Sequence, residues 1–131
     1  MMIMLDYKDT RPIYEQVVEK FQTLILKGVL EPDAQLPSVR SLAVELSINP
    51  NTIQRAYGEL ERQGFIYTIK GRGGFVRYSD DLLEIKKERL RKQLSEVLRE
   101  AEEFNIPVEE LIGQLRESSE EHAESRSSEK T

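Results

Sequence analysis

Side chains that could bind a polyanion gather in two short stretches of the sequence. Residues 36–40 read Leu-Pro-Ser-Val-Arg, and residues 70–74 read Lys-Gly-Arg-Gly-Gly. The first pattern predicts a helix start with Ser38 as N-cap and Arg40 in the first turn, and the second predicts a hairpin turn. Between them, another predicted helix start carries amide, hydroxyl and guanidinium groups that can bind base edges or phosphates. These groups belong to Asn49, Asn51, Thr52, Gln54 and Arg55, and helix capping alone explains Asn49 equally well.

The distribution of acidic side chains supports this interpretation. From Ala34 to Gly58 the only acid is Glu45, and residues 64–79 contain none. Surface helices ordinarily favour a carboxylate in the first turn, where it complements the helix dipole. A helix start that approaches phosphates is better without one, because its free N–H groups can bind phosphate themselves. We therefore predict a basic face that includes Arg72 and Arg77, the alternative being charges that are merely solvated.

The net charge of the whole chain hides this face. The 131 residues have a formal net charge of −5, which by itself argues against a nucleic-acid partner. However, residues 1–78 carry ten basic and nine acidic side chains, whereas residues 79–131 carry nine and fifteen. Such an asymmetry indicates two regions with different tasks. The sequence has no cysteine, which excludes thiol chemistry, and no apolar run long enough for a membrane span, so we expect a cytoplasmic protein.

Catalysis finds little support in the residues. The only histidine, His122, lies in a polar segment with nothing to orient or desolvate it. The glycines of residues 71–74 lack the following Lys-Ser/Thr pair of a phosphate-binding loop, and a strand rather than a helix comes after them. We therefore expect no enzymatic activity, no cofactor and no metal site.

Two short helices and a hairpin are the elements that must position the candidate side chains. Two sets of apolar residues each follow the i, i+3, i+4, i+7 pattern of a helix with one buried face. They are Val39, Leu42, Ala43 and Leu46, then Ile53, Ala56, Tyr57 and Leu60. The tight joint at residues 47–50 predicts a helix-turn-helix, preceded by a helix that starts near Pro12 and stops at Gly28. Residues 65–69 and 75–78 are β-rich and predict the hairpin strands.

From about Asp80 the pattern is that of a long helix, a break at residues 105–107 and a shorter helix. Apolar residues alternate spacings of four and three with Lys87 among them, which is typical of a coiled-coil seam. We predict dimerisation through Leu83, Leu90, Leu94, Val97, Phe104, Leu111 and Leu115. Residues 117–131 have no apolar face and are predicted to be disordered. The predicted division is therefore 1–78, 79–116 and 117–131.

Several motifs, in order along the chain, resemble the winged helix-turn-helix of GntR-type bacterial transcription regulators. They lie at residues 12–16, 36–43, 51–57, 64–66 and 71–76. The resemblance implies an α+β fold with a winged helix-turn-helix followed by a two-helix C-terminal dimerisation segment. It implies DNA contacts at Arg40, at residues 49–54 and at the wing tip. Asp33 departs from the family pattern, where glycine is common, as does Gly74, where threonine or serine is usual.

The C-terminal segment resembles the short YtrA-type subfamily, whose members often regulate ABC transporter genes and dimerise through these helices. The resemblance implies a homodimer, more often a repressor, on a palindromic operator in double-stranded DNA. The segment is too short for an effector domain, and a small-molecule effector is left open. The alternative is a winged-helix adaptor whose basic face binds an acidic protein. The complete set of predicted DNA-contacting residues is Ser38, Arg40, Asn49, Asn51, Thr52, Gln54, Arg55, Lys70, Gly71, Arg72 and Gly73.

Overall fold

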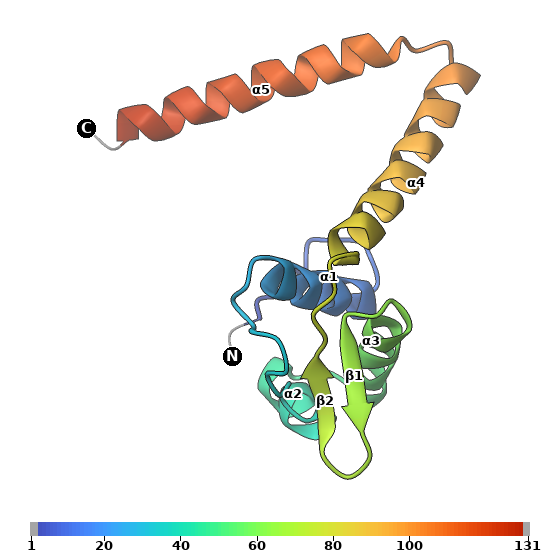
Figure 1. Cartoon of the computed structure of the whole chain (residues 1–131). Helices are drawn as coiled ribbons and strands as arrows, with labels where there is room; N and C mark the ends of the chain where they lie inside the picture. The colour runs from blue at the N-terminus through green and yellow to red at the C-terminus, as the bar shows by residue number, and fades with distance from the viewer. Residues whose placement is uncertain (1–2, 130–131) are drawn as a thin grey trace. The chain divides into compact units, whose positions relative to one another are not determined.

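The computed structural model describes the backbone of residues 3–129 and the side chains of residues 3–120. Within this range, five helices and a two-stranded antiparallel sheet make the α+β winged helix-turn-helix and helical C-terminal part that the sequence predicted (Figure 1). The elements are α1 Ile13–Leu26, α2 Val39–Leu46, α3 Pro50–Arg62, β1 Ile66–Ile69, β2 Gly73–Val76, α4 Leu82–Glu103 and α5 Val108–Glu129. None of the described helices is long and apolar enough to cross a membrane.

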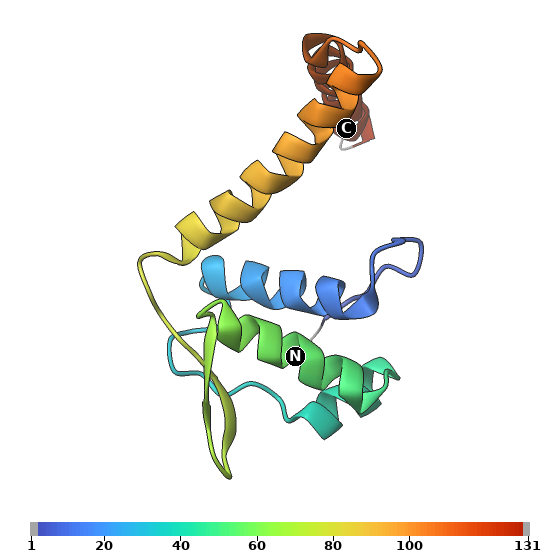
Figure 2. The same cartoon turned by 90° about the vertical axis from the view of Figure 1, so that its right-hand side faces the viewer.

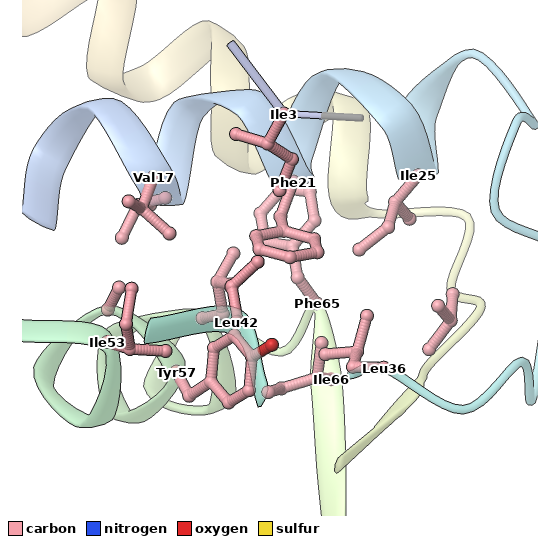
Figure 3. Packing of buried hydrophobic residues seen from close by; sticks show 14 of the residues in the cluster. Ile3, Val17, Phe21, Ile25, Leu36, Leu42, Ile53, Tyr57, Phe65 and Ile66 are labelled. Carbon is pink, nitrogen blue, oxygen red and sulfur yellow. The ribbon is translucent and has the colours of Figure 1, made fainter. Parts of the chain in front are cut away.

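The hydrophobic core of the winged helix lies among α1, α2, α3 and the hairpin. Figure 3 shows Phe21, Leu42 and Tyr57, from three different helices, pointing toward one another. The rings of Phe21 and Tyr57 meet edge to face with centroids 5.6 Å apart. The two predicted apolar stripes supply much of this core, since Leu42, Ala43, Ile53, Ala56, Tyr57 and Leu60 are all buried. The prediction that Tyr57 packs in the core is confirmed.

The helix boundaries follow the predicted caps. Ser38 Oγ accepts a hydrogen bond from the N–H of Ser41 at 3.0 Å, and Asn49 Oδ1 accepts one from the N–H of Asn51 at 2.8 Å. Pro12 is itself the N-cap residue of α1, one position before the helix, and makes no side-chain cap. The first four helices are each followed closely by a residue with positive φ, which turns the chain out of the helix. These residues are Gly28, Ser47, Gly64 and Asn105.

The chain divides into two compact units after Lys86, so the first turn of α4 packs with the winged helix. The sequence placed the division at residue 78. Leu82 is only 3% exposed and Ile85 packs against the same core, because these two apolar residues lie one turn apart on one face of α4. The hydrophobic cluster of the first unit therefore extends into α4.

Hydrogen bonds of the Gln22 side-chain amide accompany this packing. The Gln22 side chain, in α1, is 1% exposed. Its Oε1 accepts a hydrogen bond from Lys86 Nζ at 3.1 Å, and its Nε2 donates one to Gln63 Oε1 at 2.5 Å. A buried amide needs such partners, because an unsatisfied polar group would destabilise the fold. Gln22 thereby joins α1 to the end of α3 and to the first turn of α4.

The last helix is longer than the sequence indicated. The apolar pattern stops at Leu115, and residues 117–131 were predicted to be disordered, whereas α5 continues through Glu129. No glycine or proline follows Gly113, and the segment is rich in glutamate, with alanine and arginine also present, all good helix formers. Helix propensity therefore continues α5 where an apolar face is absent. The side chain of His122, and residues 130–131 altogether, lie outside the described part of the chain.

Candidate nucleic-acid interface

The helix-turn-helix differs from the other helices in the charge of its helix starts. α2 and α3 have no acidic residue in the first turn, whereas α1 has Glu15, α4 has Glu84, and α5 has Glu109 and Glu110. Among the described helices, only these two present an N-terminal dipole that no carboxylate neutralises. An uncompensated helix start is an anion-binding feature, because its free N–H groups point outward.

Arg40 lies in the first turn of α2, two residues after the Ser38 cap, and its side chain is exposed. The cap fixes the helix start, and the fixed helix start determines the direction in which the guanidinium can reach. Leu42 is fully buried and lies about 200° around α2 from Arg40, so the side of the helix opposite Arg40 faces the core. Arg40 is therefore held on the outer face of the helix start.

The start of α3 presents a polar outer face. Asn51 and Gln54 are exposed, while Thr52 is half-buried beside the fully buried Ile53. The Asn49 side-chain oxygen is already used as the helix cap, which leaves only its NH2 group for another partner. Asn51 and Gln54 are thus the amide side chains of the first turns that have both ends available for reading a base edge.

Arg55 is positioned differently from its neighbour Gln54. Its guanidinium carbon lies 3.8 Å from the centroid of the Tyr14 ring, in α1. Stacking on an aromatic face orients a guanidinium without using its N–H donors. The sequence predicted Arg55 as a contact residue but not Tyr14, the second residue of α1, which gave no sign of a partner 41 residues away. Arg55 is thereby held beside α1.

The six arginines of the first unit fall into two groups. Arg11 is ion-paired with Asp9 and Glu19, and Arg62 with Glu59. Hydrogen bonding to Arg11 holds the pKa of the Asp9 carboxyl below its usual value. The candidates Arg40 and Arg72, together with Arg77, make no ion pair within the described residues and Arg55 stacks on a ring. Their charges stay available to an external anion.

The wing consists of β1, β2 and the turn at residues 70–72, which points away from α1 in both views (Figures 1 and 2). Gly71 and Gly73 have φ values of +82° and +95°, a region that side chains with a Cβ rarely adopt. The turn is closed by the N–H of Arg72, which donates to the carbonyl oxygen of Ile69 at 2.9 Å. Lys70, Gly71, Arg72 and Gly73 are all exposed, as a contact with a nucleic acid requires.

The segment before α2 lies along the wing as a third extended stretch. The N–H of Val76 donates to Ala34 and the N–H of Leu36 donates to Gly74, at 2.8 and 2.9 Å. Further out, Gln35 Nε2 donates to the carbonyl oxygen of Arg72 at 2.7 Å. Sequence reasoning missed Gln35, since a single glutamine in a loop carries no spacing signal. The wing and the start of α2 are therefore joined by one short stretch of chain.

The structure explains Asp33, one of the two departures from the family pattern, but does not require glycine at the other, Gly74. Asp33 has a φ of +65°, the conformation for which glycine is favoured and aspartate is tolerated. Its Oδ1 accepts a hydrogen bond from the Tyr67 hydroxyl at 2.8 Å, which raises the pKa of that phenol. A Cβ at Gly74 would lie 3.5 Å from the terminal methyl carbons of Ile66 and Leu36, an ordinary contact. A side chain at position 74 would therefore start toward these apolar residues.

The predicted dimerisation residues form an exposed apolar set on α4 and α5. Leu83, Leu90, Leu94, Val97, Phe104 and Leu115 are between 49 and 69% exposed. Leu111 is half-buried, and Ala101, which follows Val97 at a spacing of four, is buried. Exposure of many large apolar side chains to water is unfavourable, and a contiguous exposed apolar surface is typical of an interaction site.

Comparison with known proteins places the described fold among bacterial regulators. Residues 13–76 match the family model described as bacterial regulatory proteins, gntR family. The chain is 38% identical over 120 residues to the HTH-type transcriptional repressor YtrA of Bacillus subtilis (strain 168), covering 90% of this chain and 92% of that protein.

Solved structures are similar as well. YtrA from Sulfolobus acidocaldarius, a GntR-family transcription factor, superposes with a TM-score of 0.62 at 32% identity, covering 76% of this chain and 99% of that one. The DNA-binding domain of AraR in complex with operator ORR3 superposes with a TM-score of 0.50 at 32% identity. That match covers 58% of this chain and 92% of that one.

Proposed function

The chain belongs to the GntR family of bacterial regulatory proteins, and we propose that it is a transcriptional repressor that binds an inverted-repeat operator as a homodimer. The DNA-binding surface is supported by the two helix starts without acidic residues and by the wing, whose Arg72 has no ion pair among the described residues. A relative of nearly the same length is named a repressor, and the similar AraR domain is named in complex with its operator. Such a regulator works in the bacterial cytoplasm and needs no catalytic group.

The roles of the contact residues follow from their positions. α3 enters the major groove, where Asn51 and Gln54 read base edges, with Thr52 and the NH2 group of Asn49 beside them. Arg40, the start of α2 at Ser38, and Arg55 bind the phosphate backbone. The wing tip, with Lys70, Gly71, Arg72 and Gly73, contacts the backbone or minor groove beside the site, and its glycines allow close approach.

The homodimer follows from the exposed apolar set on α4 and α5. A second copy of the chain is the occupant that fits best, because a two-fold interface covers the same residues on both subunits at once. The repeat of apolar residues at spacings of four and three is the pattern that pairs helices in this way. Two recognition helices then reach successive major grooves about 34 Å apart, which requires an inverted repeat.

The regulated genes that we propose are transporter genes, as the resemblance to the YtrA-type subfamily implies. Sequencing genomic fragments that the protein retains would locate the operators. Operators lying away from transporter genes would contradict this part of the proposal.

Selection of bound DNA from a random pool tests the function as a whole. We expect an enriched inverted repeat, whose half-site spacing gives the distance between the two recognition helices. Affinity should fall steeply with salt, because neutralised phosphates release counterions. Recovery of no preferred sequence, together with weak binding that a low salt concentration already abolishes, would contradict the proposal and favour the adaptor.

Three single substitutions then test the contact residues on the selected operator. Arg40→Ala should weaken binding to every sequence, whereas Gln54→Ala should change which base is preferred in the half-site. Lys20→Ala removes the same charge from an exposed position of α1 and should bind as the wild type does. If Arg40→Ala and Gln54→Ala both match the Lys20 control in a gel-shift series, the assigned surface is wrong.

A further inference from the structure

We infer that Gln35 is a positioning residue for the wing: its side-chain amide holds the main chain of the wing tip in the conformation from which Arg72 reaches DNA. The inference rests on the proposed DNA contact of the wing, and it adds a residue that neither the sequence pattern nor the comparisons point to. Its basis is the hydrogen bond of 2.7 Å from Gln35 Nε2 to the carbonyl oxygen of Arg72.

The wing tip needs an external support because its own backbone is permissive. Gly71 and Gly73 flank Arg72, and both have positive φ, so the chain on either side of Arg72 can rotate with little steric hindrance. One backbone hydrogen bond, from the N–H of Arg72 to the carbonyl oxygen of Ile69, closes the turn. The bond from Gln35 fixes the opposite end of the same residue, its carbonyl group. Together they hold the peptide planes on both sides of the Arg72 side chain.

Gln35 can act as a support because the backbone on both sides of it is anchored. The preceding residue, Ala34, accepts a hydrogen bond from the N–H of Val76 at 2.8 Å. The following residue, Leu36, is 3% exposed and donates its N–H to Gly74 at 2.9 Å. Next in the chain, the Pro37 carbonyl oxygen is held by the Tyr57 hydroxyl at 2.8 Å. The wing tip is thus braced against the stretch that also leads into α2.

This arrangement predicts an effect on affinity without an effect on folding. Ordering a flexible loop on binding costs conformational entropy and weakens the affinity, whereas a loop that is already ordered has no such cost. Gln35 is exposed, so the loss of its amide should leave the unfolding temperature unchanged. For one lost hydrogen bond we expect an affinity loss of about three- to tenfold.

The competing explanation is that the exposed Gln35 touches DNA directly. Gln35→Met keeps the side-chain length and removes the donor, and Arg72→Ala removes the contacting group but keeps the carbonyl oxygen. A double-mutant cycle of these variants distinguishes the two, because residues that act through one another give non-additive losses. The cycle is measured by fluorescence anisotropy on the operator selected from a random pool, at one fixed salt concentration.

We expect Gln35→Met to weaken binding when Arg72 is present and to add nothing in the Arg72→Ala background. Additive losses, or an unchanged affinity of Gln35→Met, would overturn the inference. A wild-type affinity of Arg72→Ala would overturn it as well, and would remove the wing contact while leaving Arg40 and α3 in place. Hydrogen exchange of the free protein is the second readout, with faster exchange of the wing-tip amides in Gln35→Met.

The two readouts separate the inference from the proposed function. If no operator can be selected, the proposed function fails, and faster exchange of the wing-tip amides would then support the brace alone. Wing-tip amides that exchange as in the wild type overturn the brace, whatever the protein binds. Equal unfolding temperatures of wild type and Gln35→Met are the condition under which both readouts are compared.

Discussion

The hydroxyl of Tyr57, in α3, donates a hydrogen bond to the carbonyl oxygen of Pro37 at 2.8 Å. Pro37 precedes the Ser38 cap of α2, so this bond joins the start of one helix to the middle of the other. Burial, and secondarily the charge of Glu45, raises the pKa of the Tyr57 phenol above its usual value, which keeps the hydroxyl protonated as a donor. The start of α2 and the middle of α3 are therefore joined by a hydroxyl that has to stay neutral.

Tyr57→Phe should reduce the free energy of unfolding by about 1–2 kcal/mol, because it keeps the buried ring and leaves a carbonyl oxygen without its donor. Chemical denaturation monitored by circular dichroism measures this change. A loss above about 4 kcal/mol would mean that the ring packing, and not the hydrogen bond, has been disturbed.

The same residue predicts a pH dependence. A phenol whose pKa is higher in the folded state stabilises the fold fully below the unfolded pKa of 10.0, and this contribution is lost as pH rises above that value. The wild type should therefore lose stability between pH 10 and 11 more steeply than Tyr57→Phe. Equal slopes for the two proteins over this interval would contradict the assignment.

Substitution of Ser38 separates folding from binding. Ser38→Ala should lower the free energy of unfolding by about 1 kcal/mol, because the cap of α2 is lost. Ser38→Asp keeps a cap and complements the helix dipole, so its stability should match the wild type, while its carboxylate repels phosphate. Wild type and Ser38→Asp should thus be equally stable, but the affinity for the selected operator should be much lower for Ser38→Asp. Wild-type binding by Ser38→Asp would place the start of α2 away from DNA.

The two adjacent glycines of β2 should respond differently to alanine. Gly73 has a φ of +95°, where a Cβ is strained, so Gly73→Ala should lower the free energy of unfolding by about 1–2 kcal/mol. At Gly74, a Cβ meets only ordinary contacts at 3.5 Å, so Gly74→Ala should be neutral or slightly stabilising. Thermal unfolding of both variants checks the order, and the reverse order would contradict the turn geometry.

Leu94→Glu should dissociate the proposed homodimer, because it places a charge in the middle of the apolar set on α4. Sedimentation velocity should show a monomer, and operator binding should weaken and become more dependent on protein concentration. Ser95→Glu is the matched control: it adds the same charge at an exposed position turned about 100° around the helix. If Leu94→Glu stays as dimeric as Ser95→Glu, the dimer interface does not include this face of α4.

The caps and the apolar stripes were predictable because they depend on neighbours along the chain. Ser38, Asn49 and the buried face of α3 follow from local spacing and were found as predicted. The partners of Arg55 and of the Arg72 carbonyl oxygen were not predictable, since Tyr14 and Gln35 lie 41 and 37 residues away and only the tertiary fold brings them near. Candidate contact residues could thus be proposed from the sequence, whereas the side chains that hold Arg55 and the Arg72 carbonyl oxygen could not.

The length of α5 shows a different reason for failure. A helix without an apolar face has no periodic signal, so the sequence analysis ended it near Arg116, while the backbone stays helical to Glu129. The same reasoning applied to α4 succeeded, because its apolar residues mark its turns until Asn105, whose positive φ ends the helix. The spacing of apolar residues predicts helices that have a buried face. It does not predict a helix that forms through intrinsic helix propensity alone.

The packing of Leu82, Ile85 and Lys86 fixes where this protein can be cut and rejoined. A chimera that carries the winged helix onto a foreign dimerisation module has to keep the native chain through Lys86. Splicing at residue 78 would expose the apolar surface that Leu82 covers and would remove Lys86, the donor to the side-chain oxygen Oε1 of Gln22. The unit to be transferred is therefore the winged helix together with the first turn of α4, and the fusion point should lie within α4, after Lys86.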